Sequence, residues 1–290
     1  KKEKSLKETY AYAFESYKKK DLKKAEHACY KILSIDPNHI DSISLLATIC
    51  AVKKNYEEAK KLIIKVLQIE PQNLTALNNL GTSYKELGEF KQAIDIFEKL
   101  LKINPNHTNA NYNIGLAHYA LRDLSKAKFY LKKVTEIQNN FAYAFYSLAN
   151  IHVDLKELNN AVSCYKKAIE INPNIVAAHN NLGITYRELN DLKNAIDSYK
   201  KAIKIKIDHS SAHHNLGQAY KEMGNFKKSI ESHEEAIKYQ PNNLMNYYFL
   251  SELKESILDE ELKDKIKIIL KEDKLKLNNL AYGNYLLAKY

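Results

Sequence analysis

The prolines of this sequence recur at a fixed interval. Successive distances are 34, 34, 68 and 68 residues for the five prolines Pro37, Pro71, Pro105, Pro173 and Pro241. The two places on this grid that lack proline hold Asn139 and Ile207. A fixed period of about 20 to 50 residues is typical of chains built from stacked structural repeats. The spacing therefore predicts a repeat protein rather than a chain of ordinary globular domains.

Six of the seven glycines lie on the same grid. We number each repeat so that proline takes position 32. Position 8 is then glycine in four repeats, at Gly81, Gly115, Gly183 and Gly217. Position 15 is glycine in two repeats, at Gly88 and Gly224. Breakers of regular structure that share one phase mark the turns and close contacts of each repeat. The grid predicts an N-terminal extension at residues 1–5 and seven repeats at residues 6–39, 40–73, 74–107, 108–141, 142–175, 176–209 and 210–243.

Each repeat has the pattern of two amphipathic helices. Apolar residues recur at three- and four-residue steps on both sides of a turn, which is Gly88-Glu89 in the third repeat. Position 16, the second residue of this turn, holds Asp, Asn or Glu in every repeat. Asp or Asn at this place can cap the second helix by accepting a backbone N–H, and proline at position 32 ends that helix. We expect two helices of about 14 residues in each repeat, each roughly 20 Å long.

Small and large residues occupy fixed positions in the repeat. Position 20 is Ala in six repeats and Ser229 in the last, so the second helix is slim where it crosses the first. Position 7 is large in every repeat, beginning with Tyr12, and is expected to fill the core. A leucine in place of Ala195 would overpack the crossing at a cost of about 1–3 kcal/mol.

Charge, cysteine content and motifs argue against several classes of function. The formal net charge is +10, but 45 basic residues are interleaved with 35 acidic ones, which argues against nucleic acid as the partner. The three cysteines form no Cys-x-x-Cys pair, which favours a reduced, cytoplasmic setting. No segment has the roughly 18 consecutive apolar residues of a membrane span. Phosphate-binding loops, nucleophile elbows and His-Glu-x-x-His motifs are missing, so we expect neither catalysis nor a cofactor in this chain.

The pattern of small and large residues resembles the tetratricopeptide repeat family over residues 6–243. The third repeat shows it well, with Asn79-Leu80-Gly81-x-x-Tyr84 followed by Ala93, Phe97 and Pro105. The first two repeats depart most, because Ser16 and Cys50 stand where the family prefers Tyr. The resemblance implies an all-α, right-handed α-solenoid superhelix of seven helix-turn-helix hairpins, followed by capping helices at residues 244–290. It also implies a non-catalytic scaffold that binds a protein or an extended peptide in a concave groove lined by the first helices.

The resemblance places positions 2, 5, 6, 9, 12 and 13 of each first helix in this groove. Position 6 is asparagine in four repeats, namely Asn79, Asn113, Asn181 and Asn215. A row of amides offers donors and acceptors at regular intervals, which suits the main chain of a peptide. The row is similar to the asparagine ladder in the repeats of O-linked N-acetylglucosamine transferases. The alternative interpretation, that these asparagines serve the hairpin itself, stays open.

Other groove positions add aromatic and polar side chains. The candidates are Tyr112, Tyr146, Asn150, Asn180, Arg187, His214, Gln218 and Lys221. Clustered tyrosines are good anchors because each buries a large area and carries one polar group. The competing explanation is a bias toward tyrosine throughout the sequence, which contains 21 of them. A chaperone-tail adaptor is not expected, because Tyr146 and Ser211 stand where its carboxylate clamp needs lysines.

Two further patterns have both a functional and a structural explanation. His118 and His152 could be metal ligands, but a third ligand is missing, and we expect buried core histidines and no metal site. Lysine occupies position 26 of six repeats, from Lys31 to Lys201. This row could bind phosphate, but a solvated outer face is the simpler explanation.

Residues 244–290 leave the grid but keep a helical pattern. We expect helices at 244–257 and 260–270, a charged connector at 271–276, and at 280–286 the first helix of a further repeat whose second helix would follow Tyr290. Residues 248–254 and 280–283 are similar to the linker of bacterial sulfotransferases that carry tetratricopeptide repeats. That resemblance implies the alternative function, the substrate-recognition arm of a larger transferase whose catalytic domain lies outside this chain.

Overall fold

The computed structural model describes residues 2–254, 257–271 and 277–289, and these residues form 17 α-helices and no strand. The first eight helices are α1 Lys2–Lys18, α2 Leu22–Leu33, α3 Ile40–Val52, α4 Tyr56–Ile69, α5 Leu74–Glu86, α6 Phe90–Ile103, α7 Thr108–Ala120 and α8 Leu124–Ile137. The others are α9 Ala142–Asp154, α10 Leu158–Ile171, α11 Val176–Glu188, α12 Leu192–Ile205, α13 Ser210–Glu222, α14 Phe226–Tyr239, α15 Leu244–Ser251, α16 Glu260–Leu270 and α17 Leu277–Leu287.

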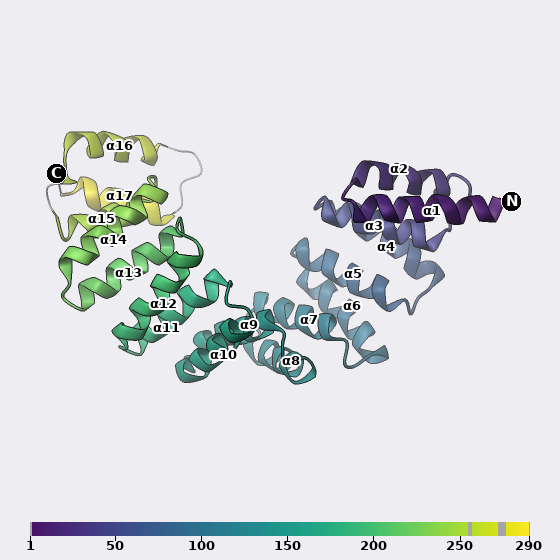
Figure 1. Ribbon diagram of the computed structural model, residues 1–290, viewed down its shortest axis with the longest axis horizontal. Helices are drawn as coiled ribbons and strands as arrows, with labels where there is room; N and C mark the ends of the chain where they lie inside the picture. The colour runs from purple at the N-terminus through teal and green to yellow at the C-terminus, as the bar shows by residue number, and fades with distance from the viewer. Residues whose placement is uncertain (1, 255–256, 272–276, 290) are drawn as a thin grey trace. The chain divides into compact units, whose positions relative to one another are not determined.

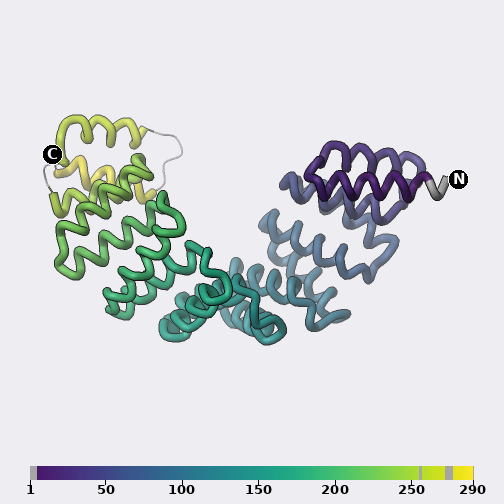
Figure 2. Tube along the Cα trace, in the orientation of Figure 1, coloured from purple at the N-terminus to yellow at the C-terminus, as the bar shows by residue number. Residues whose placement is uncertain are grey.

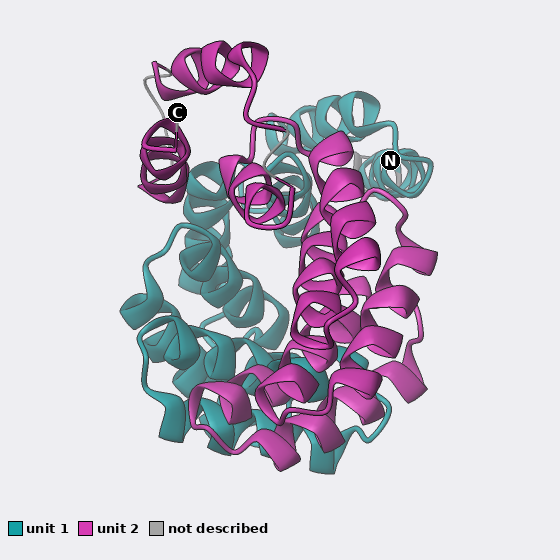
Figure 3. Cartoon of the chain, turned by 90° about the vertical axis from the view of Figure 1, so that its left-hand side faces the viewer, with its two compact units in different colours: residues 1–147 teal, residues 148–290 magenta. Residues whose placement is uncertain are grey.

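The chain divides into two compact units, unit 1 with residues 1–147 and unit 2 with residues 148–290 (Figure 3). In unit 1, α1 packs on α2, α3 on α4, α5 on α6, and α7 on α8 (Figure 1). In unit 2, α11 packs on α12 and α13 on α14. The Cα trace in Figure 2 turns back after each of these helices, so every pair is an antiparallel hairpin. The fold is a solenoid of helical hairpins, which confirms the predicted fold class.

Asp and Asn at position 16 cap the second helices, as the sequence predicts. In α2, α4, α8, α12 and α14 the side chain accepts a hydrogen bond from the backbone N–H three residues later, and these caps are Asp21, Asn55, Asp123, Asp191 and Asn225. Glu89 and Glu157 make no such bond at α6 and α10. The short side chains of Asp and Asn suit this bond, whereas the longer glutamate contributes only its charge near the helix start.

The residue before each cap adopts a left-handed backbone conformation. Gly88 and Gly224 have φ angles of 78° and 77°. The same position in the other hairpins has φ between 59° and 61°, at Lys20, Lys54, Arg122, Lys156 and Asn190. A left-handed residue closes a helix and turns the chain back, which explains why glycine recurs at position 15 of the grid.

Small residues let the paired helices approach closely. The alanines at position 20 and Ser229 have no exposed surface, namely Ala25, Ala59, Ala93, Ala127, Ala161, Ala195 and Ser229. A Cβ added to Gly81 would lie 2.6 Å from Phe97 Cε1, and one added to Gly183 would lie 2.6 Å from Tyr199 Cε1. These distances are far below van der Waals contact, so an added methyl group would push the opposing ring aside.

Tyr12 departs from the predicted core. It is 54% exposed, whereas Leu46, at the same position of the next hairpin, is 1% exposed. Leu46 belongs to one buried cluster with Ala13 and Ala25 of the first hairpin, whereas α1 has no hairpin before it among the described residues. The prediction was wrong here because a repeat pattern does not distinguish a terminal repeat from an internal one.

The helices after residue 243 follow the predicted order with one difference in length. α16 coincides with the helix predicted at 260–270, and α17 includes the helix predicted at 280–286. The helix predicted at 244–257 is shorter, because α15 ends at Ser251, where the backbone N–H groups of Leu253 and Lys254 both bond to the Leu250 carbonyl. Residues 272–276 of the predicted connector lie outside the described residues.

The three C-terminal helices share a small core of their own. Its buried members come from all three helices and are Leu244, Leu262, Ile266, Ile269 and Leu286. Gly283 of α17 lies at the centre of this contact, since a Cβ there would be 2.7 Å from Leu270 Cδ2 and 2.9 Å from Leu244 Cδ1. α15 also packs on α14, which joins this C-terminal group to the last hairpin.

Candidate functional site

Four predicted asparagines in unit 2 form one hydrogen-bonded chain, which we call the amide row. Asn215 on α13 donates from Nδ2 to Asn180 Oδ1 at 3.0 Å, and Asn180 on α11 donates to Asn181 Oδ1 at 3.3 Å. Asn181 donates in turn to Asn150 Oδ1 on α9 at 3.2 Å. The structure therefore connects side chains from three successive first helices into one polar surface.

The amide row ends on a buried phenol. Tyr165 on α10 is 1% exposed, and its hydroxyl donates to Asn150 Oδ1 at 2.5 Å. Tyr165 was not predicted as a site residue, because an aromatic residue at position 24 is expected in the core of the hairpin. The available signal was the pairing of this tyrosine with an amide at position 9 of the same repeat.

Both ends of the amide row keep hydrogen-bonding capacity. Asn150 Nδ2 donates to no described residue, and Asn215 Oδ1 accepts from none of them. Asn150, Asn181 and Asn215 are partly exposed, whereas Asn180 is buried. The row thus offers N–H groups at α9 and a carbonyl oxygen at α13, which are the two kinds of group that a peptide main chain can pair with.

Arg187 and Lys221 stand six residues beyond Asn181 and Asn215 on the same two helices. Arg187 Nε lies 3.8 Å from Glu222 Oε1, so part of its charge is balanced within the protein. Gln218 on α13 has a buried Nε2 with no hydrogen-bond partner among the described residues. These three predicted residues lie on the helices of the amide row and add positive charge and an unused amide donor to them.

His214 does not lie on an accessible surface, contrary to the prediction. It is buried under α15, and its Nδ1 lies 2.9 Å from Asn246 Oδ1. Its ring contacts those of Phe249 on α15 and His233 on α14, each at a centroid distance of 5.2 Å. Burial lowers the pKa of His214 to about 4 and that of His233 to about 3. The prediction was wrong because it treated position 5 of α13 as a groove position, although the expected capping helix after residue 243 covers His214.

The asparagines of unit 1 are arranged differently from those of unit 2. Asn113 on α7 accepts a hydrogen bond from Lys85 Nζ on α5 at 3.0 Å. Asn79 is partly exposed on α5, and no side-chain hydrogen bond joins it to Asn113 in the described part of the chain. Unit 1 therefore does not repeat the continuous chain of amides that unit 2 contains.

Aromatic side chains gather at the C-terminal end of unit 1. Tyr112 packs against Phe141, with ring centroids 4.9 Å apart, and its hydroxyl lies 3.5 Å from Ser147 Oγ. Burial raises the pKa of Tyr112. Tyr146 on α9 is partly buried, whereas Tyr143 is 51% exposed. The predicted Tyr112 is therefore largely a packing residue, and Tyr143 offers the more accessible ring.

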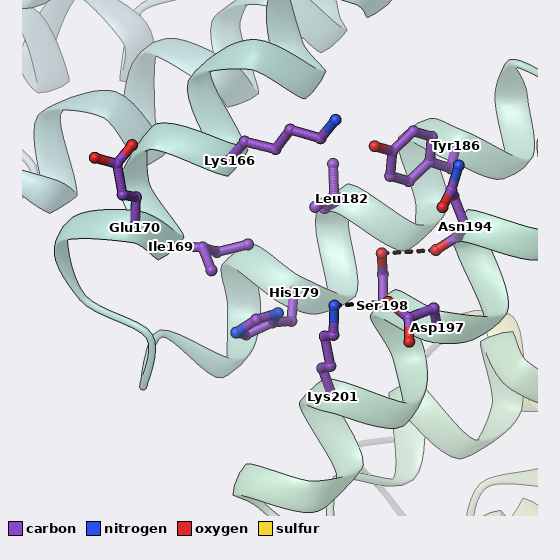
Figure 4. A pocket seen from close by; sticks show the side chains of 10 residues that line it. All are labelled: Lys166, Ile169, Glu170, His179, Leu182, Tyr186, Asn194, Asp197, Ser198 and Lys201. Atoms are coloured by element: carbon purple, nitrogen blue, oxygen red, sulfur yellow. Dashed lines mark hydrogen bonds and ion pairs between the residues drawn. The ribbon is translucent and has the colours of Figure 1, made fainter.

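A cleft of about 420 Å³ lies between α10, α11 and α12 in unit 2 (Figure 4). Lys166 and Lys201 stand on its walls, and Leu182 and Tyr186 of α11 line it as well. Lys201 belongs to the lysine row at position 26, and its Nζ lies 2.6 Å from Asp197 Oδ2. Lys167 of the same row pairs with Glu170, and such neighbouring carboxylates favour the interpretation as a solvated outer face over a phosphate site.

His118 and His152 are core residues, as the sequence predicts. They are 5% and 7% exposed. Each ring faces the carboxylate at the next helix cap: His118 Nδ1 lies 3.4 Å from Asp123 Oδ2, and His152 Nδ1 lies 2.5 Å from Glu157 Oε2. Over the described ranges, no three His, Cys, Asp or Glu side chains stand close enough together to hold a metal ion. None of the helices described has the length and apolar character needed to cross a membrane.

Comparison with protein families settles the nature of the repeat. Tetratricopeptide repeat patterns match residues 40–106, 72–140 and 210–243, and a further pattern of TPR repeats matches residues 149–188 and 185–224. These matches together span most of the chain. The chain belongs to the tetratricopeptide repeat family. The matches end at residue 243, so the resemblance of residues 244–290 to sulfotransferase linkers stays a prediction.

Solved tetratricopeptide structures resemble the fold. A tetratricopeptide repeat protein from Parabacteroides merdae is 19% identical, with a TM-score of 0.64, and the alignment covers 86% of this chain and 98% of that one. MamA is 25% identical, with a TM-score of 0.54, over 56% of this chain and 95% of MamA. YrrB, described as a TPR protein with an unusual peptide-binding site, is 20% identical, with a TM-score of 0.56, over 64% of this chain and 96% of YrrB. No curated protein sequence matches the chain.

Proposed function

We propose that this tetratricopeptide chain is a non-catalytic scaffold that binds an extended polypeptide along the first helices of unit 2. The observation that carries the proposal is the amide row, which crosses α9, α11 and α13 and keeps unused donors at Asn150 and unused acceptors at Asn215. YrrB, which shares the fold, is described as binding a peptide, and that description supports the same class of partner here.

The hydrogen bonds within the amide row favour a role beyond the hairpin. Asn215 bonds to Asn180 and Asn181 bonds to Asn150, so both contacts join different hairpins rather than the two helices of one hairpin. The Tyr165–Asn150 bond joins the two helices of one hairpin, so the row connects successive repeats as well as serving a hairpin. Bonds between repeats also orient each amide before a ligand arrives, which lowers the entropy lost on binding.

The double substitution Asn181→Ala with Asn215→Ala tests this proposal. The probe is a dodecapeptide selected from a random phage-displayed library on the unmodified chain, then synthesised with blocked ends. Asn215→Ala removes a ligand acceptor and Asn181→Ala removes the amide bonded to Asn150, and each loss should cost about 1 kcal/mol. We expect the double variant to bind the peptide roughly thirtyfold more weakly in isothermal titration calorimetry.

Asn159→Ala is the matched control for this experiment. Asn159 is exposed on the second helix α10, and its side chain makes no hydrogen bond in the described structure. The control variant should bind the peptide with unchanged affinity, and circular dichroism melts should show that all variants remain folded. Equal affinity of the double variant and the unmodified chain would contradict the proposal, as would a library that yields no binding peptide.

A further inference from the structure

Tyr165 and Tyr199 take the same place in consecutive hairpins, but only Tyr165 meets the amide row. Both side chains are buried, with 1% and 0% of their surface exposed. The Tyr165 hydroxyl donates to Asn150 Oδ1, whereas the Tyr199 hydroxyl is buried without a hydrogen-bond partner in the described residues. The difference lies in the first helix, where position 9 is Asn150 in one hairpin and Ile184 in the other.

The contact with Tyr165 determines which group Asn150 can offer to a ligand. An amide oxygen has two lone pairs. Those of Asn150 are engaged by the Tyr165 hydroxyl at 2.5 Å and by Asn181 Nδ2 at 3.2 Å. If the Asn150 amide turned over, its Nδ2 would face the Nδ2 of Asn181, and two donors would oppose each other. The amide oxygen therefore faces the protein, and both N–H groups of Asn150 stay unused.

We infer that Tyr165 is a positioning residue that holds Asn150 as a hydrogen-bond donor, so that the ligand must present an oxygen atom at α9. This inference rests on the proposed function, because it states which group of the bound peptide meets which helix. A main-chain carbonyl of the peptide meets Asn150. At the other end of the amide row, Asn215 Oδ1 is the open acceptor and meets a main-chain N–H of the peptide.

Three substitutions test the role of Tyr165 with the library-selected dodecapeptide as the probe. Tyr165→Phe keeps the buried ring and removes only the hydroxyl, and the loss of the fixed amide should weaken binding about fivefold. Asn150→Asp keeps two acceptors for Tyr165 and Asn181 but removes both N–H groups. Its carboxylate would repel a carbonyl oxygen, so binding should weaken more than tenfold. Tyr199→Phe, the matched control, should bind with unchanged affinity.

The side-chain ¹⁵N–¹H signals of Asn150 provide a readout that does not depend on the peptide. Their chemical shifts should change in Tyr165→Phe and stay the same in Tyr199→Phe. They should also change when the dodecapeptide is added to the unmodified chain. Unmoved Asn150 signals in Tyr165→Phe would overturn the positioning role, as would wild-type affinity in Asn150→Asp.

The two proposals can fail separately. If Asn181→Ala with Asn215→Ala loses the peptide while Tyr165→Phe and Asn150→Asp bind normally, the proposed function stands and the positioning role is rejected. If no library peptide binds the unmodified chain, the proposed function is rejected, and the ligand contact inferred for Asn150 is rejected with it.

Discussion

At the scale of single residues, the neighbour across the hairpin decides what a buried polar side chain does. Tyr165 and Tyr199 have the same position and similar burial, yet one hydroxyl has an amide partner and the other has none among the described residues. A buried donor without a partner costs about 1–3 kcal/mol, whereas a paired one contributes to stability. One hydroxyl should therefore stabilise the fold, and the other should destabilise it.

Removal of these two hydroxyl groups should have opposite effects on stability. Tyr199→Phe should raise the free energy of unfolding by about 1 kcal/mol, because the folded protein no longer buries an unpaired hydroxyl. Tyr165→Phe should lower it by a similar amount, about 1 kcal/mol, because Asn150 loses a bond. Urea denaturation followed by circular dichroism measures both. A decrease of equal size in the two variants would contradict the hydrogen-bond assignment.

The role of a residue could be predicted from the sequence where it depends on neighbouring residues of the chain. It could not be predicted where it depends on contacts with distant residues. The helix caps Asp21 and Asn55 were predictable, because a cap needs only the backbone three residues later. The burial of His214 was not, because it depends on α15, which lies about 30 residues further along the chain and follows no repeat pattern. The partner of Tyr165 was equally hard to predict, because position 9 varies from repeat to repeat and holds asparagine only at Asn150.

At the scale of helices, α15 closes the last hairpin over two histidines. His233 on α14 has no exposed surface, and neither ring nitrogen has a hydrogen-bond partner in the described residues. Its ring stacks on Phe249 of α15, at a centroid distance of 6.0 Å and an angle of 13°. His233 fills the space under Gly217, which Phe97 fills under Gly81 in an earlier hairpin. A histidine thus stands where the other hairpins carry Cys29, Ile63, Phe97, Leu131, Tyr165 and Tyr199.

The contact between α13, α14 and α15 should weaken in acid. Burial lowers the pKa of His214 to about 4 and of His233 to about 3, both from 6.5. Arg187 also disfavours the charged form of His214, as Lys221 does for His233, while the bond to Asn246 partly opposes this for His214. Below pH 6.5 the unfolded chain binds protons that the folded chain does not, so stability falls from about pH 6.5 to about pH 4 through His214 and to about pH 3 through His233.

His233→Phe should remove part of this pH dependence. Each buried histidine contributes a loss of up to about 1.4 kcal/mol per pH unit within that range. The variant, which copies the aromatic residue of the third hairpin, should lose less stability between pH 7 and pH 5 than the unmodified chain in urea denaturation. His27→Phe, at an exposed position on α2, is the control and should leave the pH dependence unchanged. Identical pH profiles for His233→Phe and the unmodified chain would contradict this account.

The apolar pattern predicted the helices of the seven repeats correctly. After residue 243 it predicted one helix that is too long. Within the grid, alternating small and large residues fix which helices pair, and the hairpins follow. Beyond it, the apolar spacing that predicted a helix over 244–257 continued through a turn. Leu253 and Ile257 belong to the pattern, but α15 ends at Ser251, and Ile257 packs against the C-terminal core from outside that helix. Tertiary contacts override local helical preference at such a place.

At the scale of the whole molecule, the charges are distributed in a way that suits a protein partner. The excess of ten positive charges is spread over the chain, and ion pairs between neighbouring hairpins, such as Lys53–Glu26 and Lys60–Glu89, balance part of it. A nucleic-acid partner would require a continuous basic surface and would bind in a steeply salt-dependent manner. Recognition through uncharged amides is expected to depend little on salt. The amide row of unit 2 is therefore the central element of the proposed function.

Photo-crosslinking of the selected dodecapeptide tests the location of binding most directly. Ala177 is exposed on α11, one helical turn before Asn181, whereas Asn159 is exposed on the second helix α10. With p-benzoylphenylalanine placed at either position, we predict that irradiation attaches the peptide to the chain modified at 177 and not to the chain modified at 159. Attachment from position 159 alone would contradict binding along the first helices.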